Sequence, residues 1–249
     1  MQPLTKGRYQ ARLARTGAEV ALAQQLRYLA FYQSRGMRQP GGLDCDDFDA
    51  SSYHMLIEDM DANALVGCYR VQQFRGEAVE SSYSAQFYDL SRLSQFPGAL
   101  LELGRFCLHP NHHDPDILRL GWAAMARLVD AWGVALLFGC SSFAGADPAP
   151  HAAALAALRQ RPPPMSFRPG PRAPERVALA AFQPMGPGAA LSAMPALLRS
   201  YLSIGAWVSD HAVIDRAMDT LHVLTGVEIA AIPPARARIL REIAAEKMG

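Results

Sequence analysis

The sequence predicts an α/β protein (α+β in its details) in which helices flank a central mixed sheet. Three observations support this prediction. Strand-like and helix-like apolar patterns alternate between residues 50 and 142, half of the residues are hydrophobic, and 24 basic residues nearly balance 23 acidic ones. The composition supplies a buried core and excludes a disordered chain. The near-zero net charge argues against a protein that binds nucleic-acid phosphates.

The first part of the chain is expected to alternate helices with strands, because apolar residues recur at helical spacing in some segments and at strand spacing in others. Asp114 begins the second helix as its N-cap, Pro115 occupies the first turn, and Gly133 ends it. Gly104 is expected to interrupt the third strand. The expected elements are a helix over 18–35, strands over 53–57, 65–74 and 100–108, a helix over 115–132 and a strand over 134–142.

A proline-rich segment dominates the second part of the chain. Nine of the 18 prolines lie between Pro162 and Pro195, which predicts an irregular insertion over residues 160–195. We expect one domain over residues 1–249 and no transmembrane segment. The remaining expected elements are a short strand over 176–182, a helix near 195–205, strands near 207–213 and 221–229, and a basic helix over 234–248.

The last helix combines apolar residues at helical spacing with four basic side chains. Such a helix either packs on the core or lies on a membrane surface, so peripheral membrane contact is a hypothesis. The four cysteines show no C-x-x-C pair, and the N-terminus has no apolar signal segment. These features favour reduced thiols and a cytoplasmic protein.

The residue spacing argues against two other candidate sites, a metal site and a nucleophilic serine. His109, His112 and His113 precede Asp114 and Asp116, but the pattern matches no zinc motif and indicates a polar loop, so no metal is expected. The run from Cys140 to Ser142 lacks the G-x-S-x-G pattern of a nucleophilic serine. Small residues at the end of a strand explain it better.

Charge is distributed unevenly near the N-terminus. Residues 1–43 hold seven basic residues and one acid, whereas residues 44–61 hold seven acids and no Lys or Arg. Facing basic and acidic walls would suit a zwitterionic substrate. Two separate solvated faces explain the same pattern.

Glu102 is the most informative candidate for catalysis. It lies in an otherwise apolar strand, where a carboxylate is costly unless it is partnered or used. Burial would suit such a group to accept a proton from an ammonium group. A structural ion pair with Arg105 or Arg70 is the alternative.

Many short motifs, in one order along residues 8–225, carry a resemblance to a known family. The chain resembles the GNAT-fold L-ornithine Nα-acyltransferases that make ornithine lipids. More distantly it is similar to the acyl-homoserine-lactone synthases. The matching motifs are LRYLAF at 26–31, DDFD at 46–49 followed by His54, VGCYR at 66–70, YDLSR at 88–92, LELGR at 101–105, FGCSSF at 138–143, GADP at 145–148, LLRSYL at 197–202 and DHAVID at 210–215.

The resemblance implies a GNAT fold and transfer of a 3-hydroxyacyl chain from acyl carrier protein to the α-amino group of ornithine, giving lyso-ornithine lipid. It implies Glu102 as the general base. Asp46 and Asp49 would hold the cationic acceptor, and one or more arginines would bind its carboxylate or instead brace the acids. These arginines are Arg27, Arg70 and Arg105.

The donor side of the reaction is also implied. The only prosthetic group expected is the 4'-phosphopantetheine carried by the acyl carrier protein. The usual acetyl-coenzyme-A loop, Q/R-x-x-G-x-G/A, is reduced to a fragment at 119–121, which favours a carrier-protein donor. The residues expected near the acyl-pantetheine are Phe31, Leu108, Arg119, Leu120, Gly121 and Ser142.

Other functions stay open at the level of sequence. The acceptor could be another amino acid, such as glycine or glutamine, or the protein could be an acyl-homoserine-lactone-type signal synthase. An inactive GNAT-like protein that binds acyl carrier protein is an alternative from a different class. The presence of Glu102 and of the acidic pair argues against inactivity.

Overall fold

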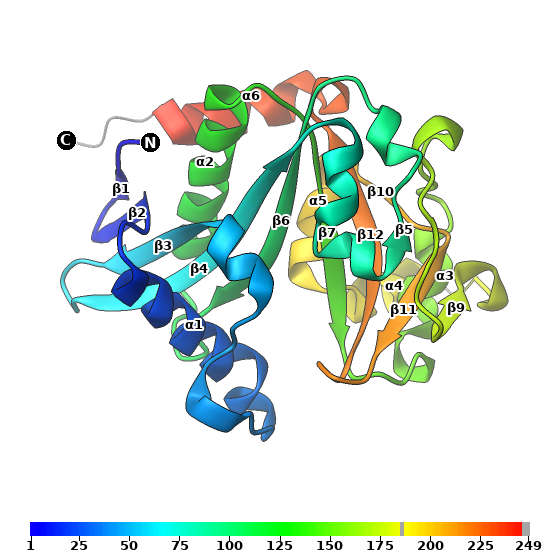
Figure 1. Cartoon of the computed structure of the whole chain (residues 1–249), viewed down its shortest axis with the longest axis horizontal. Coiled ribbons are helices and arrows are strands. Elements are labelled where there is room, and N and C mark those ends of the chain that lie inside the picture. The colour runs from blue at the N-terminus through cyan, green and yellow to red at the C-terminus, as the bar shows by residue number, and fades with distance from the viewer. Residues whose placement is uncertain (185–186, 246–249) are drawn as a thin grey trace. The chain divides into compact units, whose positions relative to one another are not determined.

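The structure, a computed structural model, describes residues 1–184 and 187–245. Figure 1 follows the chain through its elements. The strands are β1 (Leu4–Lys6), β2 (Tyr9–Leu13), β3 (Tyr53–Asp59), β4 (Ala64–Phe74), β5 (Tyr88–Asp89), β6 (Ala99–Leu108), β7 (Val134–Ala144), β8 (Gly170–Pro171), β9 (Arg176–Ala178), β10 (Trp207–Val208), β11 (His211–Asp215) and β12 (Thr220–Glu228). The α-helices are α1 (Gly17–Phe31), α2 (Pro115–Ala131), α3 (Ala152–Leu158), α4 (Pro187–Ala193), α5 (Ala196–Ser203) and α6 (Pro234–Ala245).

The chain forms two compact units, and each is built from separate stretches of sequence. Among the described residues, unit 1 contains 1–72, 103–134 and 234–245, and unit 2 contains 73–102 and 135–233. Strands β4 and β6 each contribute residues to both units. A single domain over 1–249 therefore stays a prediction.

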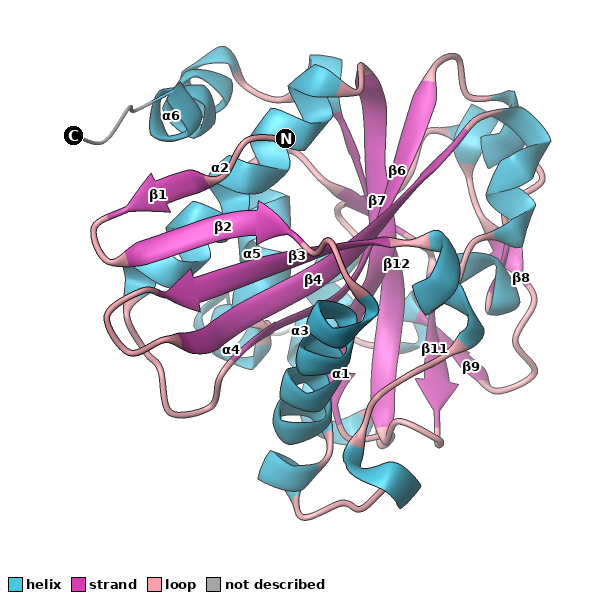
Figure 2. Cartoon of the chain, turned by 60° about the vertical axis from the view of Figure 1, so that its left-hand side comes forward, coloured by secondary structure: helices cyan, strands magenta, loops and turns pink. Residues whose placement is uncertain are grey.

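Unit 1 is a sheet with a helix on each face. Its strand order is β1, β2, β3, β4 and then the C-terminal half of β6. Side chains alternate along a strand, so the paired residues Leu56 and Cys68 face α1, while the neighbouring pair of Ile57 and Gly67 faces α2. Figure 2 shows α1 in front of these strands and α2 behind them.

Unit 2 follows the same principle around a different set of strands. The N-terminal half of β6 is followed by β7, β12, β11 and β9, with β10 paired to β12. Helices α3 and α5 cover one face, where Leu155 and Leu198 pack on Phe143. Residues 76–96 cover the other face and bury Tyr88 against Phe138 and its neighbours.

Most of the expected elements are confirmed. Thr16 caps α1 in a capping box with Glu19, and Asp114 caps α2 by accepting the Asp116 N–H at 2.9 Å. Helix α1 ends at Phe31, earlier than expected, because residues 33–35 form a 3₁₀ turn that Gly36 closes with a φ of 72°. The last helix is described to Ala245, so the rest of its expected length lies outside the described residues.

The structure corrects several expectations. Strand β6 is not interrupted at Gly104; its irregular residue is Arg105, with a φ of 55°. Strand β9 ends at Ala178, because residues 179–181 turn into a 3₁₀ helix. The proline-rich segment contains α4, so it is not wholly irregular. Strands β1 and β2 and helix α3 were not expected, because they are short and carry too few residues to show a clear period.

No helix in residues 1–184 and 187–245 is both long and apolar enough to cross a membrane.

Candidate active site

Charged side chains gather on the α1 face of unit 1. Arg27 comes from the third turn of α1, Arg70 from β4 and Arg105 from β6. Three aspartates approach them from the segment that follows α1, where Asp46 and Asp49 form the capping box of a 3₁₀ helix over 47–51. The capping box therefore fixes the acidic segment next to the arginines of α1, β4 and β6.

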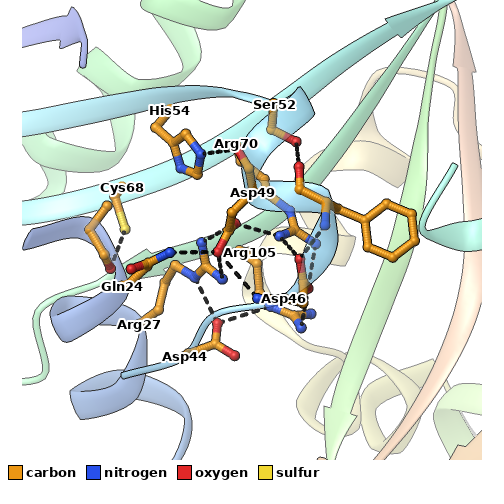
Figure 3. Close-up of polar contacts among 12 residues, drawn as sticks. Gln24, Arg27, Asp44, Asp46, Asp49, Ser52, His54, Cys68, Arg70 and Arg105 are labelled. Carbon is orange, nitrogen blue, oxygen red and sulfur yellow. Dashed lines mark hydrogen bonds and ion pairs between the residues drawn. The ribbon is translucent and has the colours of Figure 1, made fainter. Parts of the chain in front are cut away.

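These six residues form a closed ring of alternating charge, which we call the charge ring (Figure 3). Each arginine contacts two of the carboxylates, and each carboxylate contacts two of the arginines. Around the ring, the contacts run from Arg27 to Asp44 (2.7 Å), Asp44 to Arg105 (3.0 Å), Arg105 to Asp46 (3.1 Å), Asp46 to Arg70 (Nη2–Oδ2, 2.8 Å), Arg70 to Asp49 (2.6 Å) and Asp49 back to Arg27 (2.7 Å). Three positive and three negative charges cancel.

The charge ring is mostly buried. The side chains of Arg27 and Asp44 are 1% and 3% exposed. Burial opposes ionisation of Asp49, but hydrogen bonds and positive charge from Arg27, with help from Gln24 and Arg70, outweigh it and hold the pKa of Asp49 well below its ordinary value. Asp49 is therefore ionised at neutral pH, and as a buried charge it needs the opposite charges that Arg27 and Arg70 supply.

Neighbouring side chains fix the geometry of the ring. Gln24 donates from Nε2 to Asp49 at 2.9 Å. His54 lies opposite Arg70 across the β3–β4 pair, and its Nε2 is 3.0 Å from the Asp49 carbonyl oxygen. Burial lowers the pKa of His54. This neutral histidine adds a hydrogen bond without adding a seventh charge to the ring.

All five predicted acceptor-binding residues lie in the ring, and the structure adds Asp44. The sequence signal for Asp44 is the acidic run that begins at this residue, but Asp44 lies outside the DDFD motif at 46–49. Asp44 bridges Arg27 and Arg105 with Oδ2. The structure thus shows the arginines bracing the acids, and acceptor binding by these arginines stays a prediction.

Glu102 belongs to the unit 2 half of β6. It is 6% exposed, and its carboxylate accepts the backbone N–H groups of Tyr83 (3.0 Å) and Ser84 (2.7 Å). These donors compensate part of the cost of removing the carboxylate from water and fix its orientation. Its catalytic role remains a prediction.

The residues predicted to meet the acyl-pantetheine are dispersed in different environments. Leu120 is 1% exposed, and Gly121 packs so closely that an added Cβ would lie 3.1 Å from Ile57 Cδ1. Arg119 is exposed and pairs with Asp116 at 2.8 Å. The other three are Phe31 at the end of α1, Leu108 at the end of β6 and the exposed Ser142 on β7.

Asp114 places a carboxylate at the start of α2, where it would affect the binding of a ligand. Its carboxylate caps the helix and also accepts the Tyr9 hydroxyl at 3.0 Å. A phosphate at this end of α2 would therefore meet a carboxylate, and the N–H groups of Asp116 and Ile117 already bond to Asp114. Contact of the donor with these residues stays a prediction.

Comparison with known proteins first gives the class. Residues 26–123 match the family model described as an acetyltransferase (GNAT) domain. A coenzyme-A-dependent acyl-homoserine lactone synthase, BjaI, solved with MTA, superposes with a TM-score of 0.52 over 93% of this chain and 84% of that chain, at 13% identity. The fold and the domain match place the chain in the GNAT fold class.

Sequence relatives then give the family. The chain is 34% identical over 228 residues to the L-ornithine N(alpha)-acyltransferase of Rhodobacter capsulatus, covering 87% of this chain and 88% of that protein. It is 33% identical to the Brucella abortus protein of the same name, covering 87% of this chain and 83% of that protein. This chain belongs to the L-ornithine N(alpha)-acyltransferase family, which makes it an enzyme rather than an inactive binding protein.

Proposed function

We propose that this enzyme transfers a 3-hydroxyacyl chain from acyl carrier protein to the α-amino group of ornithine, giving a lyso-ornithine lipid. The names of the relatives support ornithine as the acceptor. The observation that carries the proposal is the charge ring, which supplies guanidinium groups for a carboxylate and carboxylates for a side-chain ammonium group. Ornithine carries both groups.

The reaction requires a neutral amine and a stabilised oxyanion. The α-amino nitrogen attacks the thioester carbonyl carbon, a C–N bond forms, and the C–S bond breaks. One proton leaves the amine and one proton reaches the departing thiolate. Glu102 is the proposed base, directly or through a water, because it is an acid of β6 held in place by two backbone N–H groups.

The donor is proposed to bring its own phosphopantetheine, so the enzyme has no cofactor of its own in this scheme. Phe31, Leu108 and Ser142 are the proposed contacts for the acyl-pantetheine. Arg119 stays a proposed contact for the phosphate because its guanidinium is exposed beside the first turn of α2. We also propose a cytoplasmic location with peripheral membrane contact.

Product mass decides the proposal. Purified enzyme is incubated with 3-hydroxyacyl carrier protein and ornithine, and the expected product is one amide of the expected mass. Glu102→Gln keeps the shape of the side chain and removes the base, so turnover should fall by about 10²–10⁴-fold. Arg216→Gln is the matched control, because Arg216 is an exposed partner of Glu175 outside all proposed sites.

Three outcomes would contradict parts of the proposal. Formation of a lactone, or acylation of glycine or glutamine in preference to ornithine, would show that ornithine is not the acceptor. Turnover of Glu102→Gln within tenfold of the wild type at pH 7 would remove Glu102 as the base. No product from the wild type with any amine would reject the reaction.

A further inference from the structure

The six members of the charge ring differ in their access to solvent. The Asp46 and Arg105 side chains are 22% and 12% exposed, whereas the other four are 7% exposed or less. The contact between Asp46 and Arg105, at 3.1 Å, is also the longest of the six. This contact is therefore the outer edge of the ring, and it is the one that an incoming polar molecule reaches first.

Opening the outer edge costs the ring less than opening any other. Arg105 keeps its contact from Nε to Asp44, and Asp46 keeps Arg70. The four inner residues carry two positive and two negative charges, so they remain balanced by themselves. Opening a contact of the inner residues Arg27 or Asp49 would instead remove a counter-charge from a buried group, which is strongly destabilising.

We propose that the acceptor amino acid inserts into the outer edge, its carboxylate binding Arg105 and its side-chain ammonium binding Asp46. This inference rests on the proposed function and deepens it. The inserted carboxylate and ammonium cancel each other, and the reacting α-amino group is neutral when it attacks. The enlarged ring therefore stays neutral, with every charge facing an opposite one.

The surroundings of the two residues indicate which one moves. Asp46 receives two N–H groups of Arg70 and also accepts the Phe48 N–H at 3.0 Å, so its carboxylate is fixed. Arg105 donates from Nη2 to Asp46 and from Nε to Asp44. The end of the Arg105 side chain swings from Asp46 to the acceptor carboxylate, and Asp44 acts as the pivot. Asp46 and Arg105 determine specificity, and the inner four residues position them.

Acceptors that each lack one charge test this assignment. Norvaline is ornithine without the side-chain amine, and 1,4-diaminobutane is ornithine without the carboxylate. The wild type should prefer ornithine to each by tenfold or more in kcat/KM, the usual loss when a charged hydrogen bond is missing. Asp46→Asn should reduce the preference over norvaline to within about twofold, and Arg105→Gln should do the same for 1,4-diaminobutane.

Asp44→Asn is the matched control, because it removes the same charge from the inner part of the ring. It should lower the melting temperature and the overall rate, yet keep the preference of ornithine over norvaline. If Asp46→Asn slows ornithine and norvaline equally, or if Asp44→Asn abolishes the preference as completely as Asp46→Asn does, the inference is wrong.

A binding measurement separates this inference from the proposed function. Ornithine should raise the melting temperature of the wild type more than norvaline does, with or without acyl carrier protein present. Asp46→Asn should abolish that difference. If the wild type transfers no acyl chain but shows this pattern, the proposed reaction fails and the inference stands. If ornithine stabilises the wild type no more than norvaline, the inference fails even where amide is formed.

Discussion

Asp49 joins two arginines of the charge ring and also accepts a hydrogen bond from Gln24. It accepts from Arg27 at 2.7 and 3.2 Å, from Arg70 at 2.6 Å and from Gln24 at 2.9 Å, and its side chain is 7% exposed. Asp49→Asn preserves the shape but leaves the three arginine charges of the ring facing two carboxylates. Removing one partner of a buried ion pair costs about 3–5 kcal/mol. We expect that loss in the free energy of unfolding.

Urea unfolding followed by circular dichroism, with calorimetry for the melting temperature, measures the effect. A chain of this size loses about 2–4 °C per kcal/mol, so the melting temperature should fall by about 6–20 °C. Asp47→Asn is the matched control, because Asp47 is the exposed neighbour in the same 3₁₀ helix and undergoes the same chemical change. Its effect should stay within about 0.5 kcal/mol.

The pH dependence adds a second test of the same reasoning. Asp49 has a pKa lowered from its ordinary value of 3.8, so its contribution is complete above that value and is lost as the pH falls below it. The difference in stability between wild type and Asp49→Asn should therefore shrink under acid. A loss no larger than that of Asp47→Asn, or a difference that grows below pH 3.8, would refute the picture of Asp49 as a buried, ionised member of the ring.

Three further predictions concern other parts of the chain. Burial, and to a lesser extent His211, lowers the pKa of His222 from 6.5 to about 4. The free energy of unfolding should therefore fall by about 3 kcal/mol as the pH drops from 6.5 to 4. In urea unfolding, His222→Gln should lack this pH dependence. Reversing two arginines of a basic group in unit 2 should raise the KM for acyl carrier protein but spare a short acyl-pantetheine donor, and an unchanged KM across about 50–300 mM salt would contradict this docking role. Truncation after Pro233 should leave a folded enzyme that no longer sediments with anionic vesicles; unfolding of the truncated chain, or no vesicle binding by the full chain, would make α6 structural. The basic group consists of Arg159, Arg161, Arg168, Arg172 and Arg176.

Contacts within each unit qualify the last two of these predictions. Arg172 donates to the Ala85 carbonyl oxygen at 2.7 Å and Arg176 to that of Ala173 at 2.8 Å, so parts of the basic group also support the fold of unit 2. Arg241 of α6 pairs with Asp130 of α2 at 3.2 Å, which favours packing of α6 within unit 1. Melting temperatures of the charge-reversal and truncated variants therefore belong with the binding measurements.

The sequence by itself determined the local elements and the chemical inventory of this protein. Caps such as Asp114 and stops such as Gly133 act over a few residues, so they fixed the ends of α2. The acidic run and the arginine motifs predicted which charged residues form the site. Motif order along most of the chain was sufficient for the family, because it records many positions at once.

Only the tertiary structure decided how those charges are connected. The ring joins residues 17 to 61 positions apart along the chain, and no local rule assigns Asp44 to both Arg27 and Arg105. The same holds for Glu102, whose hydrogen-bond donors are 18 and 19 residues away. The packing of α1 against the sheet determines which aspartate is buried among the arginines and which one is accessible to solvent. That is why Asp46 and Asp49, alike in the sequence motif, have different exposure in the folded protein.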